Sequence, residues 1–452
     1  MMPPRPHLPL YPFQTVGAEF LRARPLAWLA DEMGLGKTVQ VIRAAEGSPY
    51  TRNLVVCPPV VRGVWVRELE KWSLLDPFVR EIRSGKAATY LEARGTGWWI
   101  VSYPYARKYW RRFVGLVDRV IFDEVHALRN LRAKQTHELL GFEGLAHHMK
   151  SVWALTGTPS PNHPGELWPI LSTLGALPED GRSYPDFCRN YCILSSTGTP
   201  IALRGGVYAD HLKGCLGRVM LRRTKNQVGL QLPPITRSVV WVRGVDPSPE
   251  ELAASTLGRF APDELELTLQ EDRVKAEAAI ENARFDILSS GVSTLRAWIA
   301  LRKRKPLLDM LAEEARTGQY DKLLVFGMHR DLVRWLSNQL PARSGSEVID
   351  GSVSHPERER ILGRWQEGET NTIVGNIHSM GTGLTLTEAN QVVNAEPWWN
   401  EDINDQALAR AHRIGQLRPV TYRYVMLEDE PFESSLLGIL KRKKDYNNSL
   451  WS

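Results

Sequence analysis

A glycine-rich segment near the amino end of the chain carries residue types that can bind a nucleoside triphosphate. Gly34 and Gly36 allow the backbone to curl close to phosphate oxygens, and a helix beginning at Thr38 would turn its anion-attracting amino end toward them. Lys37 is expected to meet the β- and γ-phosphates, and the Thr38 hydroxyl is expected to bind Mg²⁺. Asp31 stands where the common pattern for such loops has its first glycine, so the match to that pattern is imperfect.

An acidic pair supplies the second set of candidate residues. Asp123 and Glu124 directly follow the apolar run 119–122, which predicts a buried strand with both carboxylates at its carboxyl end. Asp123 could hold hydrated Mg²⁺, and Glu124 could polarise the attacking water. His126 has two readings: it couples the nucleotide to the next motif, or it caps a helix.

Two arginines near the carboxyl end complete the candidate chemistry. Arg410 and Arg413 belong to the run 410–416, and their guanidinium groups could reach a γ-phosphate from another domain. A helix-capping or salt-bridge role is the alternative for both. Together with Lys37 and the acidic pair, these arginines predict hydrolysis of a nucleoside triphosphate with Mg²⁺ as the cofactor.

These loops need a parallel sheet to position them. Short apolar runs that are followed by loop signals and helical-period segments are typical of buried parallel strands, and chemistry then belongs at the carboxyl ends of those strands. The sequence therefore predicts an α/β protein with two sheet domains. The expected strands are 26–30, 53–57, 98–102, 119–122 and 151–155, followed by 322–326, 347–349, 371–374 and 391–394.

The segment between the two sheet domains has a different composition. Residues 249–305 are rich in Glu, Ala, Leu and Arg and carry few strand signals, which predicts a helical insertion. The basic run 302–305 within it is more typical of a solvated helix face than of a nucleic-acid contact. The last residues are predicted to fray. The expected domains are lobe one at 1–240, a helical linker at 241–305, lobe two at 306–440 and a basic tail at 441–452.

The composition fits a globular protein of two to three domains, because 43% of the 452 residues are apolar and 24% are charged. A formal net charge of +6 favours a polyanionic partner without proving one. The four cysteines show neither zinc-ligand spacing nor a disulfide-dense pattern, which predicts reduced thiols in an intracellular protein. The first ten residues lack the apolar core of a usual signal peptide, and no apolar run approaches membrane-spanning length.

The order of these blocks resembles one family, the Swi/Snf-type DNA translocases of helicase superfamily two. The resemblance covers residues 10–426 and implies two RecA-like lobes that use ATP and Mg²⁺. The phosphate loop has the family's own form, which explains the presence of Asp31. Gln14 resembles the residue that hydrogen-bonds adenine, while Thr156 and Thr158 resemble the block that couples hydrolysis to domain movement.

The second lobe carries blocks that bear on DNA in this family. The last block implies that its two arginines act as fingers across the cleft between the lobes. A glycine-containing loop resembles one that grips the phosphates of a single strand, although it has threonine where asparagine is common. The residues implied for coupling and DNA contact are Arg358, Gly381, Gly383, Thr385 and Gln406.

The resemblance is closest to the annealing-helicase-like branch, and the compact form suits a phage or bacterial genome. It implies an ATP-dependent translocase on duplex or forked DNA, with a task such as fork remodelling or strand annealing, located with DNA in the cytoplasm or nucleoid of a bacterial host. Two other readings are a strand-separating DNA or RNA helicase and a non-catalytic, nucleotide-gated DNA clamp. The tryptophan pairs at 98–99 and 398–399 could stack on bases, but packing is the expected role for most such residues.

Overall fold

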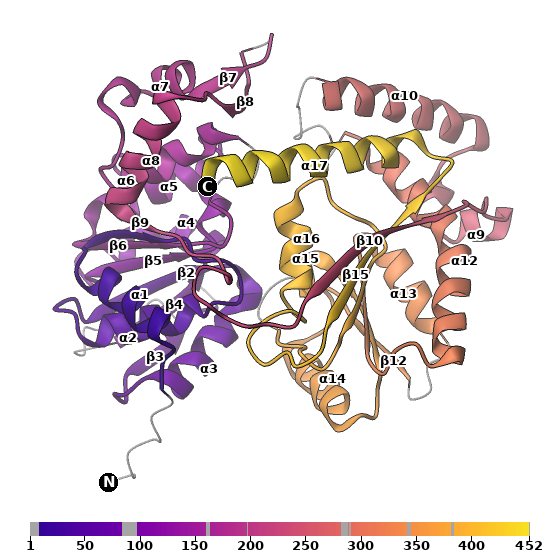
Figure 1. Ribbon diagram of the computed structural model, residues 1–452, viewed down its shortest axis with the longest axis horizontal. Coiled ribbons are helices and arrows are strands. Elements are labelled where there is room, and N and C mark those ends of the chain that lie inside the picture. The colour runs from indigo at the N-terminus through magenta and orange to yellow at the C-terminus, as the bar shows by residue number, and fades with distance from the viewer. Residues whose placement is uncertain are drawn as a thin grey trace. The chain divides into compact units, whose positions relative to one another are not determined.

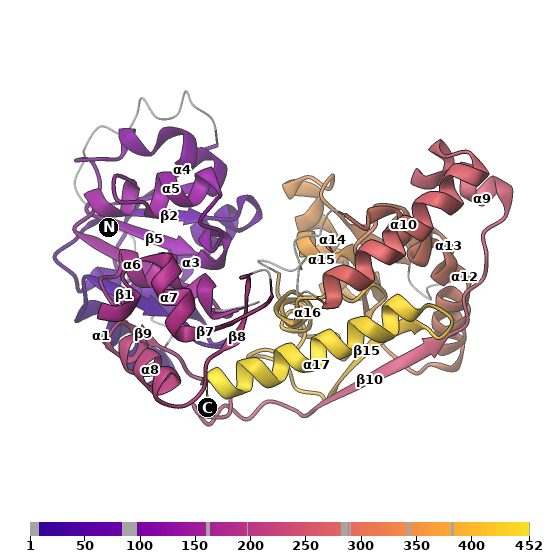
Figure 2. The same cartoon turned by 90° about the horizontal axis from the view of Figure 1, so that it is seen from above.

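The computed structural model describes residues 9–83, 97–159, 163–196, 198–281, 288, 291–340, 345–380 and 384–451. Contacts divide the chain into two compact units, which are Met1–Gln231 with Tyr446–Ser452, and Leu232–Asp445. Each unit contains a parallel sheet with helices packed on it (Figure 1, Figure 2). The predicted α/β fold with two parallel-sheet lobes is therefore confirmed.

The sheet of the first unit has the strand order β3-β4-β2-β5-β6-β1-β9, and its neighbouring strands pair in parallel. The five strands predicted for this part of the chain are present, whereas β3 and β9 are additional. Both additional strands are short, which leaves little periodic pattern in the sequence. The strands are β1 Leu26–Leu29, β2 Arg52–Cys57, β3 Phe78–Glu81, β4 Gly97–Ser102, β5 Arg119–Asp123, β6 Ser151–Leu155 and β9 Met220–Leu221.

Both faces of this sheet are buried under helices. On β5, Val120 and Phe122 belong to one hydrophobic cluster, whereas Ile121 belongs to a second cluster on the opposite face. Residues of α1 to α3 contribute to the cluster of Ile121, and residues of α4 to α8 contribute to the other. Burial on both faces makes the five predicted strands nearly continuous apolar runs, and this is why the sequence revealed them.

The helices of the first unit are α1 Pro12–Arg22, α2 Lys37–Glu46, α3 Arg62–Trp72, α4 Tyr103–Tyr109, α5 Lys134–Leu140, α6 Trp168–Thr173, α7 Tyr184–Tyr191 and α8 Val207–Val219. Short 3-10 turns lie between them, including η3 Trp110–Arg112, η4 Val125–Leu128 and η5 Leu145–His148. The strands β7 Cys192–Leu194 and β8 Pro200–Leu203 form a separate antiparallel pair.

The sheet of the second unit has the strand order β10-β15-β14-β11-β13-β12, again with parallel pairing. The four strands predicted here are present, and β10 and β15 are additional. The strands β10 and β15 pair along their whole length, so β10 is part of the second sheet although it begins within the predicted first lobe. The strands are β10 Ile235–Val242, β11 Leu323–Gly327, β12 Ser346–Ile349, β13 Thr372–Asn376, β14 Gln391–Asn394 and β15 Val420–Leu427.

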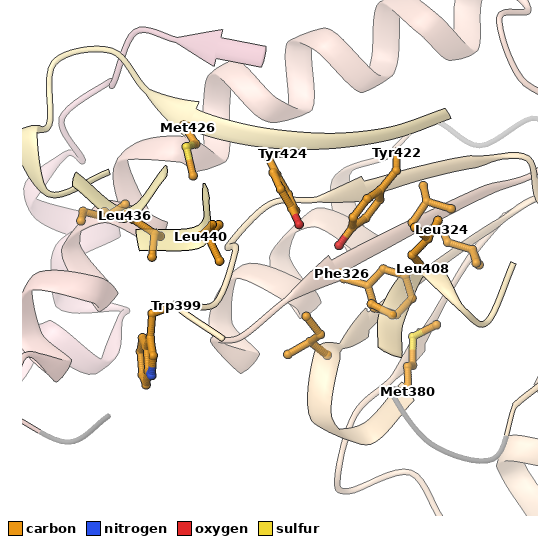
Figure 3. Close-up of a cluster of buried hydrophobic side chains, with 14 of the residues drawn as sticks. Leu324, Phe326, Met380, Trp399, Leu408, Tyr422, Tyr424, Met426, Leu436 and Leu440 are labelled. Carbon is orange, nitrogen blue, oxygen red and sulfur yellow. The ribbon is translucent and has the colours of Figure 1, made fainter. Parts of the chain in front are cut away.

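Helices cover this second sheet, and part of the resulting core appears in Figure 3, where Phe326 of β11 and Tyr422 and Tyr424 of β15 are labelled. The terminal helix contributes Leu436 and Leu440 to the same cluster. The predicted helical insertion is present as α9, α10 and α12. The helices are α9 Pro249–Ala253, α10 Pro262–Glu281, α12 Ser293–Thr317, α13 Arg330–Gln339, α14 His355–Glu367, α15 Ile377–Met380, α16 Glu401–Leu408 and α17 Pro431–Trp451.

One feature of the second unit differs from the sequence-based expectations. The basic run 302–305 is not a solvated face, because Lys303 is fully buried and Arg304 is 8% exposed. Lys303 Nζ donates to the carbonyl oxygens of Ala395 and Val425 at 3.0 and 2.7 Å, and to Glu433 Oε1 at 2.6 Å. The helix α12 is therefore anchored to the sheet through this lysine. At the end of the chain, the segment expected to fray belongs to helix α17, and the fraying itself stays a prediction.

The four cysteines are free and buried, in agreement with the predicted reduced thiols. Across the described ranges, no helix combines the length and the apolar character that a membrane-spanning helix requires.

Candidate active site

The phosphate loop follows β1 and ends at the amino end of α2. Gly36 precedes α2 with a φ of +74°, a left-handed conformation that favours glycine. A Cβ atom at this position would also lie 2.6 Å from Gln14 Nε2. Lys37 opens the helix, Thr38 follows it, and Lys37 Nζ donates to the Asp31 carbonyl oxygen at 2.9 Å. The loop therefore places a lysine, a hydroxyl and a helix amino end together.

Three carboxylates act on the ammonium group of Lys37. Burial lowers the pKa of Lys37, while Glu124, Asp31 and Asp123 act in the opposite direction. These carboxylates come from the ends of β1 and β5, which flank β6 in the sheet. The structure therefore brings the predicted phosphate loop and the predicted acidic pair together within the first unit.

The carboxylate of Asp123 is held at the end of β5. Trp65 of α3 donates from Nε1 to Asp123 Oδ2 at 2.8 Å, and Tyr103 donates from its hydroxyl to the Asp123 carbonyl oxygen at 2.9 Å. Burial raises the pKa of Asp123 to about 6, and the neighbouring Glu124 adds to this effect. Trp65 could not be identified from the sequence, because an apolar helix position carries no signal of a polar contact 58 residues away.

Glu124 is the first of three side chains in contact that lead toward β6. It has a φ of +55°, which is unusual for a residue with a side chain, and it directly precedes the 3-10 turn η4. Its Oε2 atom lies 3.3 Å from His126 Nδ1, which in turn lies 3.2 Å from Thr156 Oγ1. The Thr156 hydroxyl oxygen accepts from the Thr158 backbone N–H at 3.0 Å. The side chains of Glu124, His126 and Thr156 therefore lie in contact, and the coupling role of His126 stays a prediction.

A buried ion pair accounts for Asp31 in the position of the missing glycine. Asp31 is fully buried, and Arg223 donates to it from Nε to Oδ1 at 3.0 Å and from Nη2 to Oδ2 at 2.5 Å. Arg223 Nη1 also donates to the carbonyl oxygen of Phe13 at 2.6 Å. Arg223 is therefore a functional candidate that sequence reasoning missed, since 192 residues separate it from Asp31.

Gln14 lies against the phosphate loop. Its Oε1 atom accepts from the Tyr11 backbone N–H at 3.1 Å, and its Nε2 atom donates to the Leu35 carbonyl oxygen at 3.2 Å. Gln40 of α2 donates to the same carbonyl oxygen at 3.2 Å and to Asp31 Oδ2 at 3.1 Å. Two glutamines thus connect the segment expected to recognise adenine with the phosphate loop.

The two predicted finger arginines lie together in the second unit. Arg410 Nη1 and Arg413 Nη1 each donate to the carbonyl oxygen of Leu384 at 3.3 Å. Arg410 Nε also donates to the carbonyl oxygen of Gln406 at 3.0 Å. The block that contains the two arginines is therefore folded around the end of the loop that was expected to grip DNA.

The other residues expected at DNA are distributed over this second unit. Thr385 is exposed, and Arg358 Nη1 donates to the Ser379 carbonyl oxygen at 3.4 Å. Burial lowers the pKa of Arg358. Gly381 and Gly383 lie outside the described residues.

The chain matches two family models. A model of the SNF2-related domain matches residues 17–249, and a model of the helicase conserved C-terminal domain matches residues 302–415. The chain belongs to the SNF2-related family. The predicted relationship to Swi/Snf-type proteins is therefore confirmed.

Curated relatives of this SNF2-related chain include eukaryotic and bacterial proteins. The Xenopus tropicalis SWI/SNF-related matrix-associated actin-dependent regulator of chromatin subfamily A-like protein 1 is 29% identical, over 92% of this chain and 42% of the relative. Human DNA annealing helicase and endonuclease ZRANB3 is 27% identical, over 99% of this chain and 41% of the relative. The putative ATP-dependent helicase/translocase YwqA of Bacillus subtilis is 27% identical, over 98% of this chain and 48% of the relative. The chain spans less than half the length of each of these relatives.

Among solved structures, the Sulfolobus solfataricus SWI2/SNF2 ATPase core in complex with double-stranded DNA aligns with a TM-score of 0.45 at 21% identity, over 100% of this chain and 98% of that chain.

Proposed function

We propose that this chain is an ATP-dependent translocase on double-stranded DNA, acting in fork remodelling or strand annealing. The observation that carries this proposal is the meeting of Lys37, Asp123 and Glu124 within one unit of a SNF2-related chain. The names of its relatives, which include an annealing helicase and a putative translocase, support the same proposal. We also propose that it works with DNA in a bacterial cytoplasm, as the Bacillus subtilis relative suggests.

In this proposal the first unit binds ATP. The amino end of α2 and the Lys37 ammonium would attract the phosphates, and Gln14 would hydrogen-bond the adenine. Thr38 and Asp123 would hold Mg²⁺, since a hydroxyl and a carboxylate are the oxygen donors that this ion takes. A buried carboxylate such as Asp123, whose ionisation is opposed by burial and by the neighbouring Glu124, also suits a cation. The ion, when bound, neutralises charge on the phosphates.

Glu124 would orient and polarise the attacking water, and His126 with Thr156 would transmit the state of that site toward β6. A Glu124→Gln variant is therefore expected to keep ATP binding and to lose turnover by about 10²- to 10⁴-fold. Equilibrium binding of a fluorescent ATP analogue and single-turnover hydrolysis measure the two effects separately. Loss of binding together with turnover would point to a structural role.

The second unit would complete the reaction and hold the track. Arg410 and Arg413 would act on the transferring phosphate, which would couple hydrolysis to the geometry of the lobes. Loop amides and hydroxyls and the guanidinium of Arg358 would contact DNA phosphates, with Thr385, Gly381 and Gly383 on the gripping loop. Contacts to phosphate carry no base information, so binding is expected to be independent of sequence.

The test is the ATPase rate of the purified chain with no nucleic acid, single-stranded DNA, duplex DNA, forked DNA and RNA. Stimulation by duplex or forked DNA that falls steeply with salt is expected, together with ATP-driven displacement of the third strand of a triplex. Efficient unwinding of long blunt duplexes, or stimulation by RNA alone, would favour the strand-separating helicase. ATP binding without turnover on any of these nucleic acids would favour the non-catalytic clamp.

A further inference from the structure

The indole of Trp65 meets the carboxylate of Asp123 inside the first unit. Trp65 belongs to α3, which packs on the same face of the first sheet as α1 and α2 (Figure 1). Its side chain is fully buried, and Asp123 is 8% exposed. Trp65 Nε1 donates to Asp123 Oδ2 at 2.8 Å, which is a good length for this kind of hydrogen bond. The proposed ion ligand is therefore held from the interior of the protein.

Burial alone does not bring an acceptor to a tryptophan of this unit. Trp28 and Trp99 are also buried, and their Nε1 atoms have no hydrogen-bond partner among the described residues. Trp153 is fully buried and donates to the backbone carbonyl oxygen of Arg24 at 2.9 Å. Trp65 is therefore distinguished by its acceptor, which is the carboxylate proposed to hold Mg²⁺.

The surroundings fix the position of both groups. The Trp65 ring lies against the Trp98 ring of β4, with 6.3 Å between the ring centres, and both rings belong to one hydrophobic cluster. Tyr103 donates from its hydroxyl to the backbone carbonyl oxygen of Asp123 at 2.9 Å, and the strand that carries Asp123 pairs with β6. Since close packing restricts the rotation of a buried ring, the indole N–H holds the carboxylate in one orientation.

A neutral donor suits a carboxylate that has to bind a cation. An ionised carboxylate has about four acceptor positions on its two oxygens, so one N–H group leaves acceptor positions for a metal ion. The indole carries no charge, and it therefore does not repel the ion as a lysine or an arginine at the same place would. Carboxylates that bind metal ions in proteins are themselves held by hydrogen bonds that orient them.

We propose that Trp65 is a positioning residue for the ion that accompanies ATP. Its N–H group orients the Asp123 carboxylate and so increases the affinity of the site for Mg²⁺. This inference rests on the proposed function, because it requires Asp123 to hold the ion. The competing explanation is that the hydrogen bond serves only the stability of the first unit.

The test compares Trp65→Phe with Trp153→Phe in the full chain. Both changes remove an indole N–H from a fully buried ring of the same unit, but only the first N–H reaches Asp123. Mn²⁺, a paramagnetic substitute for Mg²⁺, is titrated into each chain with a non-hydrolysable ATP analogue, and electron paramagnetic resonance of the free ion gives its affinity. The affinity should fall about tenfold in Trp65→Phe and stay within about twofold of the unaltered chain in Trp153→Phe.

Further measurements separate positioning from stability. Binding of a fluorescent ATP analogue without any divalent ion should be unchanged in Trp65→Phe. The Mg²⁺ concentration for half-maximal ATPase should rise about tenfold, and excess Mg²⁺ should restore most of the turnover. Tyr103→Phe removes a hydrogen bond from the backbone of Asp123 and not from its carboxylate, so it should change Mn²⁺ affinity less than Trp65→Phe does.

Equal Mn²⁺ affinities of Trp65→Phe and Trp153→Phe would overturn the inference. Tighter Mn²⁺ binding in Trp65→Phe would also overturn it, because the indole would then compete with the ion. Thermal unfolding curves check the fold of both variants. Should Trp65→Phe fail to fold, benzothienylalanine at position 65, which keeps the ring shape and lacks the N–H, makes the same comparison. Failure of the proposed function would instead show as Mn²⁺ that binds the unaltered chain no more tightly than it binds Asp123→Asn.

Discussion

Two lysines of the molecule lie among carboxylates and carbonyl oxygens, one in the phosphate loop of the first unit and one in the middle of α12 in the second unit. They differ in how completely their N–H groups are paired. Lys303 is fully buried and donates to two carbonyl oxygens and to Glu433, which uses all three of its N–H groups. Lys37 is partly exposed at the first position of α2, and its hydrogen bond to Asp31 uses one of its three N–H groups.

The difference indicates which lysine is expected to be structural and which is expected to bind a ligand. Lys303 lies in the interior of a helix, where its partners are two carbonyl oxygens at the sheet and the carboxylate of Glu433 on α17. Lys37 lies at a helix amino end, after a glycine with positive φ, where an anion is favoured by the backbone as well as by the ammonium. Position on the helix and completeness of pairing, and not residue type, therefore separate the structural role of Lys303 from the phosphate-binding role proposed for Lys37.

The largest expected effect is the loss of hydrolysis in Lys37→Ala. Turnover should fall on the order of a thousandfold or more, because the site loses a charged donor aimed at the phosphates. DNA binding and thermal stability should stay close to those of the unaltered chain. Steady-state ATPase and duplex anisotropy measure the two properties, with Lys305→Ala as the control. Wild-type turnover in Lys37→Ala would contradict the assignment of the phosphate loop.

The next largest effect is expected at the finger arginines of the second unit. Arg413→Ala and Arg410→Ala should each reduce turnover by about a thousandfold with little change in ATP affinity. Both side chains donate to the neutral carbonyl oxygen of Leu384, and a guanidinium group forms stronger hydrogen bonds with a charged phosphate than with a neutral oxygen. Near-normal turnover in a folded Arg413→Ala protein would support a helix-capping role.

A smaller effect is expected for the ion pair of the phosphate loop. Arg223→Ala leaves the buried carboxylate of Asp31 without its bidentate partner, and the KM for ATP should rise roughly tenfold with a smaller change in kcat. Arg223→Lys should recover only part of the loss, since an ammonium cannot replace the two-pronged contact. Steady-state kinetics with ATP measure both constants, and Arg218→Ala is the exposed control. An unchanged KM in Arg223→Ala would show that the pair does not position the loop.

The smallest effect on turnover is expected at Lys303, where the cost is in stability. Lys303→Ala should lower the free energy of unfolding by about 3–5 kcal/mol, because Glu433 is left buried and unpaired. The double variant Lys303→Met with Glu433→Leu should recover most of this stability. Urea unfolding, followed through the transition of the second unit, gives the free energy of unfolding. A Lys303→Ala chain as stable as the original would show that Lys303 does not stabilise the second unit.

The sequence by itself determined the parts of the site that depend on neighbouring residues. A buried parallel strand is a continuous apolar run, and the loop at its carboxyl end follows directly in the chain. The phosphate loop after β1 and the acidic pair at the end of β5 were therefore predicted together with the strands that carry them. The family followed from the same local blocks, because their types and their order are visible without a fold.

Only the tertiary structure decided which distant residues complete these parts. Arg223 meets Asp31 across 192 residues, and Trp65 meets Asp123 across 58. Strand β10 joins the second sheet by pairing with β15, whose sequence lies far along the chain. The basic run around Lys303 looked solvated because charge predicts exposure on average, but the carboxylate that permits its burial, Glu433, is 130 residues away. Such pairings leave no period or spacing in the sequence, since only the packing of the sheets and helices brings the partners together.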